Sequence, residues 1–155
     1  MKLIRPVALA LLLSGMAQIT LAQTAARPAP AVLNHIAFYV ADLKTTTDFY
    51  SDLFHLEQIA EPFHDGRHSW FSLGSSGALH LIAGAKVKGT YLIDEHLCFS
   101  VPSVEAFIEQ LKAKNISYGN FAKAVGQVTL RPDGVRQIYF QDPDGHWLEV
   151  NDAKK

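Results

Sequence analysis

The sequence predicts an α+β fold built from two similar halves, each a strand, a helix and further strands that close on a hairpin. Two alternating strands begin at a histidine, within residues 34–40 and 95–101, and a stretch with helical spacing follows each of them. The ends of the halves also match, because Phe71 lies nine residues before His80 and Phe140 lies nine before Glu149. The length of 155 residues and the hydrophobic content of 48% suit a single globular domain.

The N-terminus predicts a secretory signal peptide over residues 1–22. Lys2 and Arg5 form a short positive region, residues 7–13 are apolar, and residues 20–22 resemble a small-residue cleavage site. We therefore expect a periplasmic or secreted protein that has no membrane contact once the signal is removed, with an uncleaved anchor as the alternative. Residues 23–31, rich in Ala and Pro, predict a disordered leader. The net charge of −1 gives no indication of nucleic-acid binding.

The folded domain is predicted over residues 32–152, with module one at 32–84 and module two at 94–152. In the first helix Phe49 and Leu53 lie four residues apart, and in the second Ser103 precedes apolar residues at i, i+3, i+4 and i+7. Turns at residues 74–77 and 142–145 join the closing strands of each module. The other strands are expected at residues 58–62, 69–73, 78–83, 117–122, 136–141 and 147–151.

Side-chain parity places four potential metal ligands on one face of the strands. Side chains alternate across a strand, so each of these strands has one apolar face, which we expect the helices to cover. The opposite face carries one ligand type per strand, namely His35, His80, His96 and Glu149. Three imidazoles and a carboxylate suit one divalent cation such as Zn, Ni, Co, Fe or Mn. A single histidine on a strand is more often a hydrogen-bonded residue, but the recurrence in both halves favours a metal site.

Two aromatic residues on the same face, Trp70 and Tyr139, occupy equivalent positions in the two halves. We expect them to contact a small-molecule substrate, with plain packing at the sheet edge as the alternative. The other histidines are interpreted differently: His64 and His68 as surface loop residues, His55 as the end of the first helix, and His146 as excluded by its parity.

Three stretches resemble the vicinal oxygen chelate superfamily, which includes glyoxalase I, fosfomycin-resistance enzymes, extradiol dioxygenases and bleomycin-binding proteins. They are Asn-His-Ile-Ala-Phe-Tyr-Val-Ala-Asp-Leu from residue 34, Glu-His-Leu-Cys-Phe-Ser-Val from residue 95, and Tyr-Phe-Gln-Asp-Pro-Asp-Gly-His-Trp-Leu-Glu-Val from residue 139. The resemblance implies two βαβββ modules that form a curved mixed sheet cup with the helices on the outer face. It implies metal ligands at His35, His96 and Glu149, and a fourth position at His80. Many relatives are dimers, so the modules are expected to pair within the chain or between two chains.

The pattern is closest to glyoxalase I-like proteins and implies a metal-dependent lyase or isomerase. In this chemistry the metal holds a substrate through adjacent oxygens, and Glu149 or His80 serves as the base. However, His80 stands where glyoxalase I carries Glu, and glutathione is scarce outside the cytoplasm. An extradiol ring-cleaving dioxygenase, with His80 unligated, is the first alternative. Tyr139 also matches the fosfomycin-resistance enzymes, although Ala37 replaces their Thr. A non-catalytic metal- or small-ligand-binding protein is the remaining alternative.

Overall fold

The computed structural model describes residues 27 and 29–154, and its compact unit is Val32–Lys155. The predicted signal peptide, residues 1–22, lies outside the described residues, and so does most of the predicted leader. The described leader residues, 27 and 29–31, are exposed and belong to no helix or strand. Among the helices that the structure describes, none is long and apolar enough to cross a membrane.

Module one contains β1 (His35–Val40), α1 (Leu43–Phe54), β2 (Gln58–Ile59), β3 (His68–Ser72), a short 3₁₀ turn η1 (Gly74–Ser76) and β4 (Ala78–Ala83). Its strands form a sheet of order β1-β4-β3-β2, in which β1 and β4 are parallel and the other pairs are antiparallel. The strand β1, which carries the predicted ligand His35, is therefore an edge strand that pairs on one side only.

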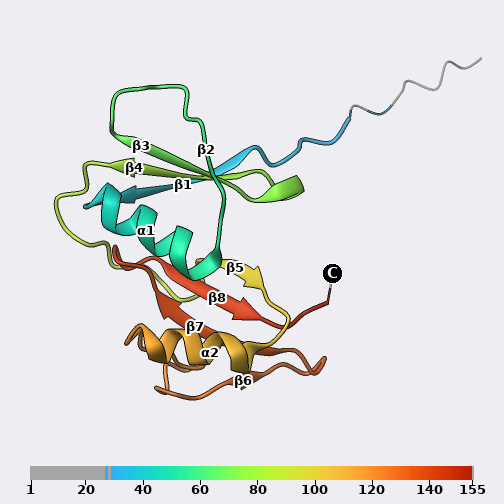
Figure 1. The fold of residues 1–155 in the computed structure, drawn as a ribbon. Helices are drawn as coiled ribbons and strands as arrows, with labels where there is room; N and C mark the ends of the chain where they lie inside the picture. The colour runs from blue at the N-terminus through green and yellow to red at the C-terminus, as the bar shows by residue number, and fades with distance from the viewer. Residues whose placement is uncertain (1–26, 28, 155) are drawn as a thin grey trace, which may run out of the picture. The chain divides into compact units, whose positions relative to one another are not determined.

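Module two repeats the arrangement with β5 (His96–Ser100), α2 (Val104–Ala113), β6 (Thr129–Leu130), β7 (Arg136–Gln141) and β8 (Trp147–Asn151). Its sheet has the order β5-β8-β7-β6, with β5 and β8 parallel, so the two modules share one topology. Figure 1 shows α1 between the strands of module one and those of module two, and α2 beside β7. Phe54 of α1 and Phe107 of α2 both contact Phe140 of β7, so both helices lie on the same apolar face of the second sheet. The α+β fold of two βαβββ modules is confirmed.

Three of the expected strands, at residues 78–83, 136–141 and 147–151, have the predicted bounds. The strand expected at residues 117–122 was wrong, because this segment makes only isolated bridges at Gly119 and the short strand β6 comes later. A local turn competes with strand pairing here. The Asn120 side chain accepts a hydrogen bond from the Ala124 backbone N–H, and Lys123 adopts a positive φ of 64°.

Both helices begin at side-chain caps. Asp42 accepts a hydrogen bond from the Thr45 backbone N–H at 2.9 Å, and Ser103 accepts one from the Ala106 backbone N–H at 3.1 Å. The first helix ends at His55, whose φ of 53° is left-handed, as expected for the end of a helix.

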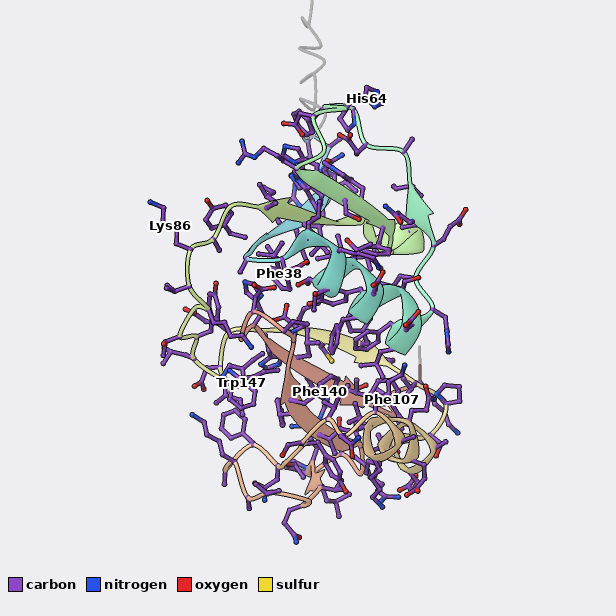
Figure 2. All side chains as sticks on the ribbon, turned by 60° about the vertical axis from the view of Figure 1, so that its left-hand side comes forward. Phe38, His64, Lys86, Phe107, Phe140 and Trp147 are labelled. Atoms are coloured by element: carbon purple, nitrogen blue, oxygen red, sulfur yellow. The ribbon has the colours of Figure 1, made fainter. Side chains whose placement is uncertain are left out.

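The core lies on the apolar faces of both sheets. Leu79 and Leu81 of β4 and Leu148 and Val150 of β8 are fully buried, as parity predicted. Phe54, at the end of α1, stacks near Phe99, Phe107 and Phe140 of module two, with ring centroids 4.2, 5.5 and 6.2 Å away. Figure 2 shows Phe107 and Phe140 beside each other in module two. The first helix therefore packs on both modules and leaves the opposite faces of the sheets for the polar residues.

The turn between β7 and β8 connects module two to module one through hydrogen bonds. Asp142 accepts a hydrogen bond from the Tyr50 hydroxyl at 3.0 Å, and Asp144 accepts hydrogen bonds from the Ala41 backbone N–H at 2.6 Å and from the Thr46 hydroxyl. Both aspartates are buried. Because a buried carboxylate needs such donors, this turn joins the two modules as well as reversing the chain.

His146 belongs to this buried contact and not to the polar faces. Its Nδ1 lies 2.8 Å from an oxygen of Asp142, and its ring stacks between Phe38 and Tyr91 at centroid distances of 4.2 and 4.3 Å. Its exclusion as a ligand on grounds of parity agrees with this position.

Candidate metal centre

Module one brings His35, His80 and Trp70 together on the polar face of its sheet. Trp70 pairs across from His80 in β3 and β4, and their rings stack at 4.2 Å. The His35 ring lies 5.7 Å from the His80 ring and 4.9 Å from the Trp70 ring, measured between centroids. His35 Nδ1 lies 2.7 Å from the Asn34 side-chain oxygen, which accepts only from a protonated nitrogen. This hydrogen bond leaves the Nε2 lone pair of His35 for a metal.

His68 also belongs to this group, and its interpretation as a surface residue was wrong. Its Nδ1 lies 2.7 Å from His80 Nε2, and its side chain is only 12% exposed. Strand alternation could have placed His68 in this group, because His68 and Trp70 are two residues apart in β3 and therefore share a face. His64 is 80% exposed, as expected, and Figure 2 shows it at the tip of the loop before β3.

Module two gathers its polar side chains around Glu149. One carboxylate oxygen accepts a hydrogen bond from the Tyr139 hydroxyl at 2.7 Å and lies 3.1 Å from His96 Nε2. The other oxygen accepts from the Asn151 side-chain amide at 2.8 Å and from the Cys98 thiol at 3.3 Å. Cys98 shares the parity of His96 in β5, and Asn151 shares the parity of Glu149 in β8, so alternation along the strands accounts for both of them on this face.

The contact between His96 and Glu149 requires a positive charge. His96 Nδ1 donates to the Ile93 carbonyl oxygen at 2.7 Å, so the neutral ring presents a lone pair at Nε2. That lone pair would face a carboxylate oxygen 3.1 Å away, which is repulsive unless a proton or a cation lies between them. A histidine with its distal nitrogen bonded to a carbonyl, beside a carboxylate, is a typical donor set for a divalent metal. The residues therefore fit the ion that the sequence predicts.

The hydrogen-bond network sets the charge of this group. Burial alone raises the pKa of Glu149, but hydrogen bonds from Tyr139, Asn151 and Cys98, with the charge of His96, outweigh burial and lower its pKa. Burial, and then the bond to Glu149, raises the pKa of the Tyr139 hydroxyl, which stays a hydrogen-bond donor. Burial and the nearby His68 and His35 lower the pKa of His80. Glu149 is therefore ionised, and His80 favours the neutral ring.

The group around His35 and His80 in module one and the group around His96 and Glu149 in module two, called the half-sites below, do not meet within one chain. Throughout residues 29–154, no three His, Cys, Asp or Glu side chains are close enough to hold a metal. His35 lies on β1 and His96 on β5, and each strand is the edge of its sheet. The polar faces of both edge strands are exposed, with Tyr39 on β1 51% exposed. The convergence of His35, His80, His96 and Glu149 on one ion stays a prediction.

The two aromatic residues expected to contact a substrate lie in the predicted half-sites. Each pairs across the strands from a predicted ligand, Trp70 from His80 and Tyr139 from Glu149. The Trp70 indole nitrogen is buried and has no hydrogen-bond partner among the described residues. A buried N–H without an acceptor is costly, so this donor suits an acceptor atom on a bound molecule. Substrate contact itself remains a prediction.

Comparisons with known proteins identify the same superfamily that the sequence motifs resemble. A family model described as the Glyoxalase/Bleomycin resistance protein/Dioxygenase superfamily matches residues 32–150. The metallothiol transferase FosB of Staphylococcus epidermidis is 29% identical over 132 residues, covering 77% of this chain and 80% of the relative. The fosfomycin resistance protein FosX of Listeria monocytogenes is 30% identical over 128 residues, covering 77% of this chain and 87% of the relative. A lactoylglutathione lyase of Pseudomonas aeruginosa is 23% identical, with 79% and 82% covered.

Solved structures share the same fold. The oxidase ChaP-H2 superposes with a TM-score of 0.67 and 21% identity, covering 81% of this chain and 96% of that one. The FosX protein of Listeria monocytogenes superposes with a TM-score of 0.64 and 25% identity, with the same coverage. The family match over most of the folded unit, together with the paired βαβββ modules, shows that this chain belongs to the Glyoxalase/Bleomycin resistance protein/Dioxygenase superfamily.

Proposed function

We propose that this protein is a metal-dependent enzyme that holds one divalent cation through His35, His96 and Glu149, with His80 beside the site. The observation that carries the proposal is the 3.1 Å contact between His96 Nε2 and a Glu149 oxygen, because two potential metal ligands are held there at a distance that needs a positive charge between them. The metal named in the FosB description supports the same conclusion. Zn, Ni, Co, Fe and Mn all suit this set of nitrogen and oxygen donors.

Two copies of the chain complete the proposed site. Each copy offers an edge strand with His35 and another with His96, and both strands expose their polar faces. An unpaired edge strand favours pairing with another chain, and a twofold dimer would bring each half-site of one copy against the other half-site of its partner.

The reaction that this arrangement favours is a lyase or isomerase reaction on a small substrate with adjacent oxygens. When bound, the cation would hold those oxygens and stabilise negative charge on them. Glu149 is kept ionised by its hydrogen bonds. His80, buried and favouring the neutral form, is the group suited to take a proton from the substrate. Trp70 would direct its unpaired indole N–H at a substrate oxygen.

The experiment is a turnover screen of the purified protein loaded separately with Zn, Ni, Co, Fe(II) and Mn. Hemithioacetals of methylglyoxal with several small thiols test the lyase, and the Glu149→Gln protein is the control. We expect isomerisation that depends on the metal and is lost in the control. Oxygen uptake with catechols would instead show the dioxygenase, and tight ligand binding without turnover under any metal would overturn both enzyme classes.

A thiol transferase is the second candidate, and the similarity to FosB and FosX favours it. These relatives are 29% and 30% identical over more than three quarters of the chain. Tyr139, the residue that matches these enzymes, lies at the proposed centre through its hydrogen bond to Glu149. The same screen includes fosfomycin with a low-molecular-weight thiol, and adduct formation would favour this candidate over the lyase.

We also propose export to the periplasm or beyond the cell, on the basis of the signal-like residues 1–22. Expression of the full chain with intact-mass measurement of the product tests this proposal. We expect a mature chain that begins at Gln23 in the periplasmic fraction. A full-length product confined to the cytoplasm would contradict it.

A further inference from the structure

His68 contacts His80 directly on the polar face of module one. The distance from His68 Nδ1 to His80 Nε2 is 2.7 Å, which is the distance of a hydrogen bond between two ring nitrogens. Both side chains are mostly buried, and neither sequence motif nor family match assigns a role to His68. Nε2 is also the nitrogen through which His80 would reach a metal if it used the same atom as His35 and His96.

The proton in this contact has one favoured position. The other nitrogen of His68, Nε2, lies 3.5 Å from an oxygen of Asp65, so a proton on that nitrogen is stabilised by the carboxylate. His68 Nδ1 is then the acceptor, and His80 Nε2 carries the hydrogen that it donates. In the opposite arrangement His80 Nε2 accepts the hydrogen bond with its lone pair. In both cases the Nε2 lone pair of His80 is unavailable to a cation.

The surrounding rings hold the pair in place. Trp70 stacks on His80 at 4.2 Å with an interplanar angle of 23°, and Phe63 stacks on His68 at 4.3 Å with an angle of 27°. Phe63 also lies nearly parallel to His80, at 5.9 Å and 11°. The backbone of the loop is fixed by Asp65, whose other oxygen accepts a hydrogen bond from the Arg67 N–H at 2.9 Å. A ring flanked in this way cannot turn its Nε2 to another partner without losing these contacts.

We propose that His68 is a positioning residue that keeps His80 Nε2 out of the metal centre, so that His35, His96 and Glu149 alone supply the protein ligands. The inference rests on the proposed metal centre and specifies its coordination. With the hydrogen on Nε2, the lone pair of His80 lies on Nδ1, and we assign it to the proton that His80 takes from the substrate and not to the metal. A centre with three protein ligands leaves more positions open for a substrate than one with four.

The test is Co(II) binding to the metal-free protein, followed by its visible absorption spectrum, which depends on the number and geometry of the ligands. We expect His35→Ala to weaken Co(II) binding by about 100-fold or more, and His80→Ala to change it by less than about threefold with the same spectrum. His68→Phe keeps a ring against Phe63 but removes the acceptor, so it frees His80. We expect it to tighten Co(II) binding severalfold and to change the spectrum.

Two matched variants make the result specific. The effect of His68→Phe should vanish in the double variant His68→Phe/His80→Ala, and His68→Asn, which places a polar atom near the position of Nδ1, should retain wild-type binding. His64→Phe, in the same loop but 80% exposed, is the control that should change nothing. Nitrogen NMR of the metal-free protein provides an independent readout. His80 should carry its hydrogen on Nε2 in the wild type, and His68→Phe should change this tautomer population.

The outcomes separate this inference from the proposed function. If His80→Ala weakens Co(II) binding as much as His35→Ala does, His80 is a ligand and the inference is wrong, while the metal centre stands. If His68→Phe leaves affinity, spectrum and tautomer unchanged, His68 does not position His80. If the wild type binds no Co(II), or His35→Ala binds it normally, the proposed centre fails and this inference with it.

Discussion

The hydroxyl of Thr46 donates a hydrogen bond to the carboxylate of Asp144, at 2.5 Å and across 98 positions of the sequence. Thr46 lies in α1 of module one, Asp144 lies in the turn before β8 of module two, and both are buried. The same turn sets the start of the strand that carries Glu149. The turn before β8 therefore has two roles. It provides the contact between the modules, and it sets the start of the strand that contributes Glu149 to the candidate metal centre.

Removal of the buried carboxylate should therefore destabilise the whole unit. We expect Asp144→Ala to lower the free energy of unfolding by about 3 kcal/mol, because the Ala41 N–H and the Thr46 hydroxyl lose their acceptor in a buried place. Urea denaturation measures the change. Asp133→Ala, in an exposed loop, should cost less than about 0.5 kcal/mol, and equal losses at the two positions would contradict the role of the turn.

A double-mutant cycle isolates the contact itself. We expect Thr46→Val and Asp144→Asn to show a coupling free energy of about 1 kcal/mol or more, since the two side chains bond directly. Additive effects would mean that each residue acts through its other contacts.

Tyr50 should make the protein sensitive to alkaline pH. Burial raises the pKa of its hydroxyl well above 10.0, with Asp142 and Asp144 adding to the shift. The unfolded chain releases this proton from about pH 10 upwards, whereas the folded chain keeps it. Unfolding therefore becomes easier as the pH rises above 10, and the contribution is complete below that value. Tyr50→Phe should flatten this decline in denaturation curves, whereas Tyr39→Phe, at an exposed position, should leave it unchanged.

Loss of the Glu149 carboxylate should remove the metal. We expect Glu149→Gln to weaken divalent-metal binding by roughly two orders of magnitude or more, and Tyr139→Phe, which removes only a hydrogen bond to that carboxylate, by about tenfold. Calorimetric titration of the metal-free protein measures both. Glu95→Gln, exposed next to β5, is the matched control. Unchanged affinity in Glu149→Gln would reject Glu149 as a ligand.

Two inactive variants should restore each other if two chains share the site. His35→Ala and Glu149→Ala each disable both sites of a symmetric dimer, but a mixed dimer contains one site with His35 from one chain and Glu149 from the other. After unfolding and refolding of an equal mixture, about a quarter of the wild-type metal sites should return, since half the dimers are mixed and each has one intact site. No recovery in a mixture shown to contain mixed dimers would indicate that each chain builds its own site.

The sequence by itself determined the modules and the face on which each ligand candidate lies. Strand alternation and helical spacing are local properties, so the repeat, the cap at Ser103, and the bounds of β4, β7 and β8 could be derived from residue order. The strand expected at residues 117–122 failed because side-chain hydrogen bonds around Asn120 stabilise a turn that alternation does not reveal. Likewise, His68 was interpreted as a surface loop residue because the strand was expected to begin at residue 69, whereas β3 begins at His68 and places it on the polar face.

Only the tertiary structure decided which of these side chains meet. The pairing of His68 with His80, and of Asp144 with Thr46 and Ala41, joins segments whose distance depends on how sheets and helices pack. It also separated the predicted ligands into two pairs, because the helix-covered faces form the common core and leave the polar faces of β1 and β5 at open edges. Local sequence patterns indicate which face of a strand or helix a residue occupies. The packing of the modules, governed by burial of their apolar faces, decides which faces come together.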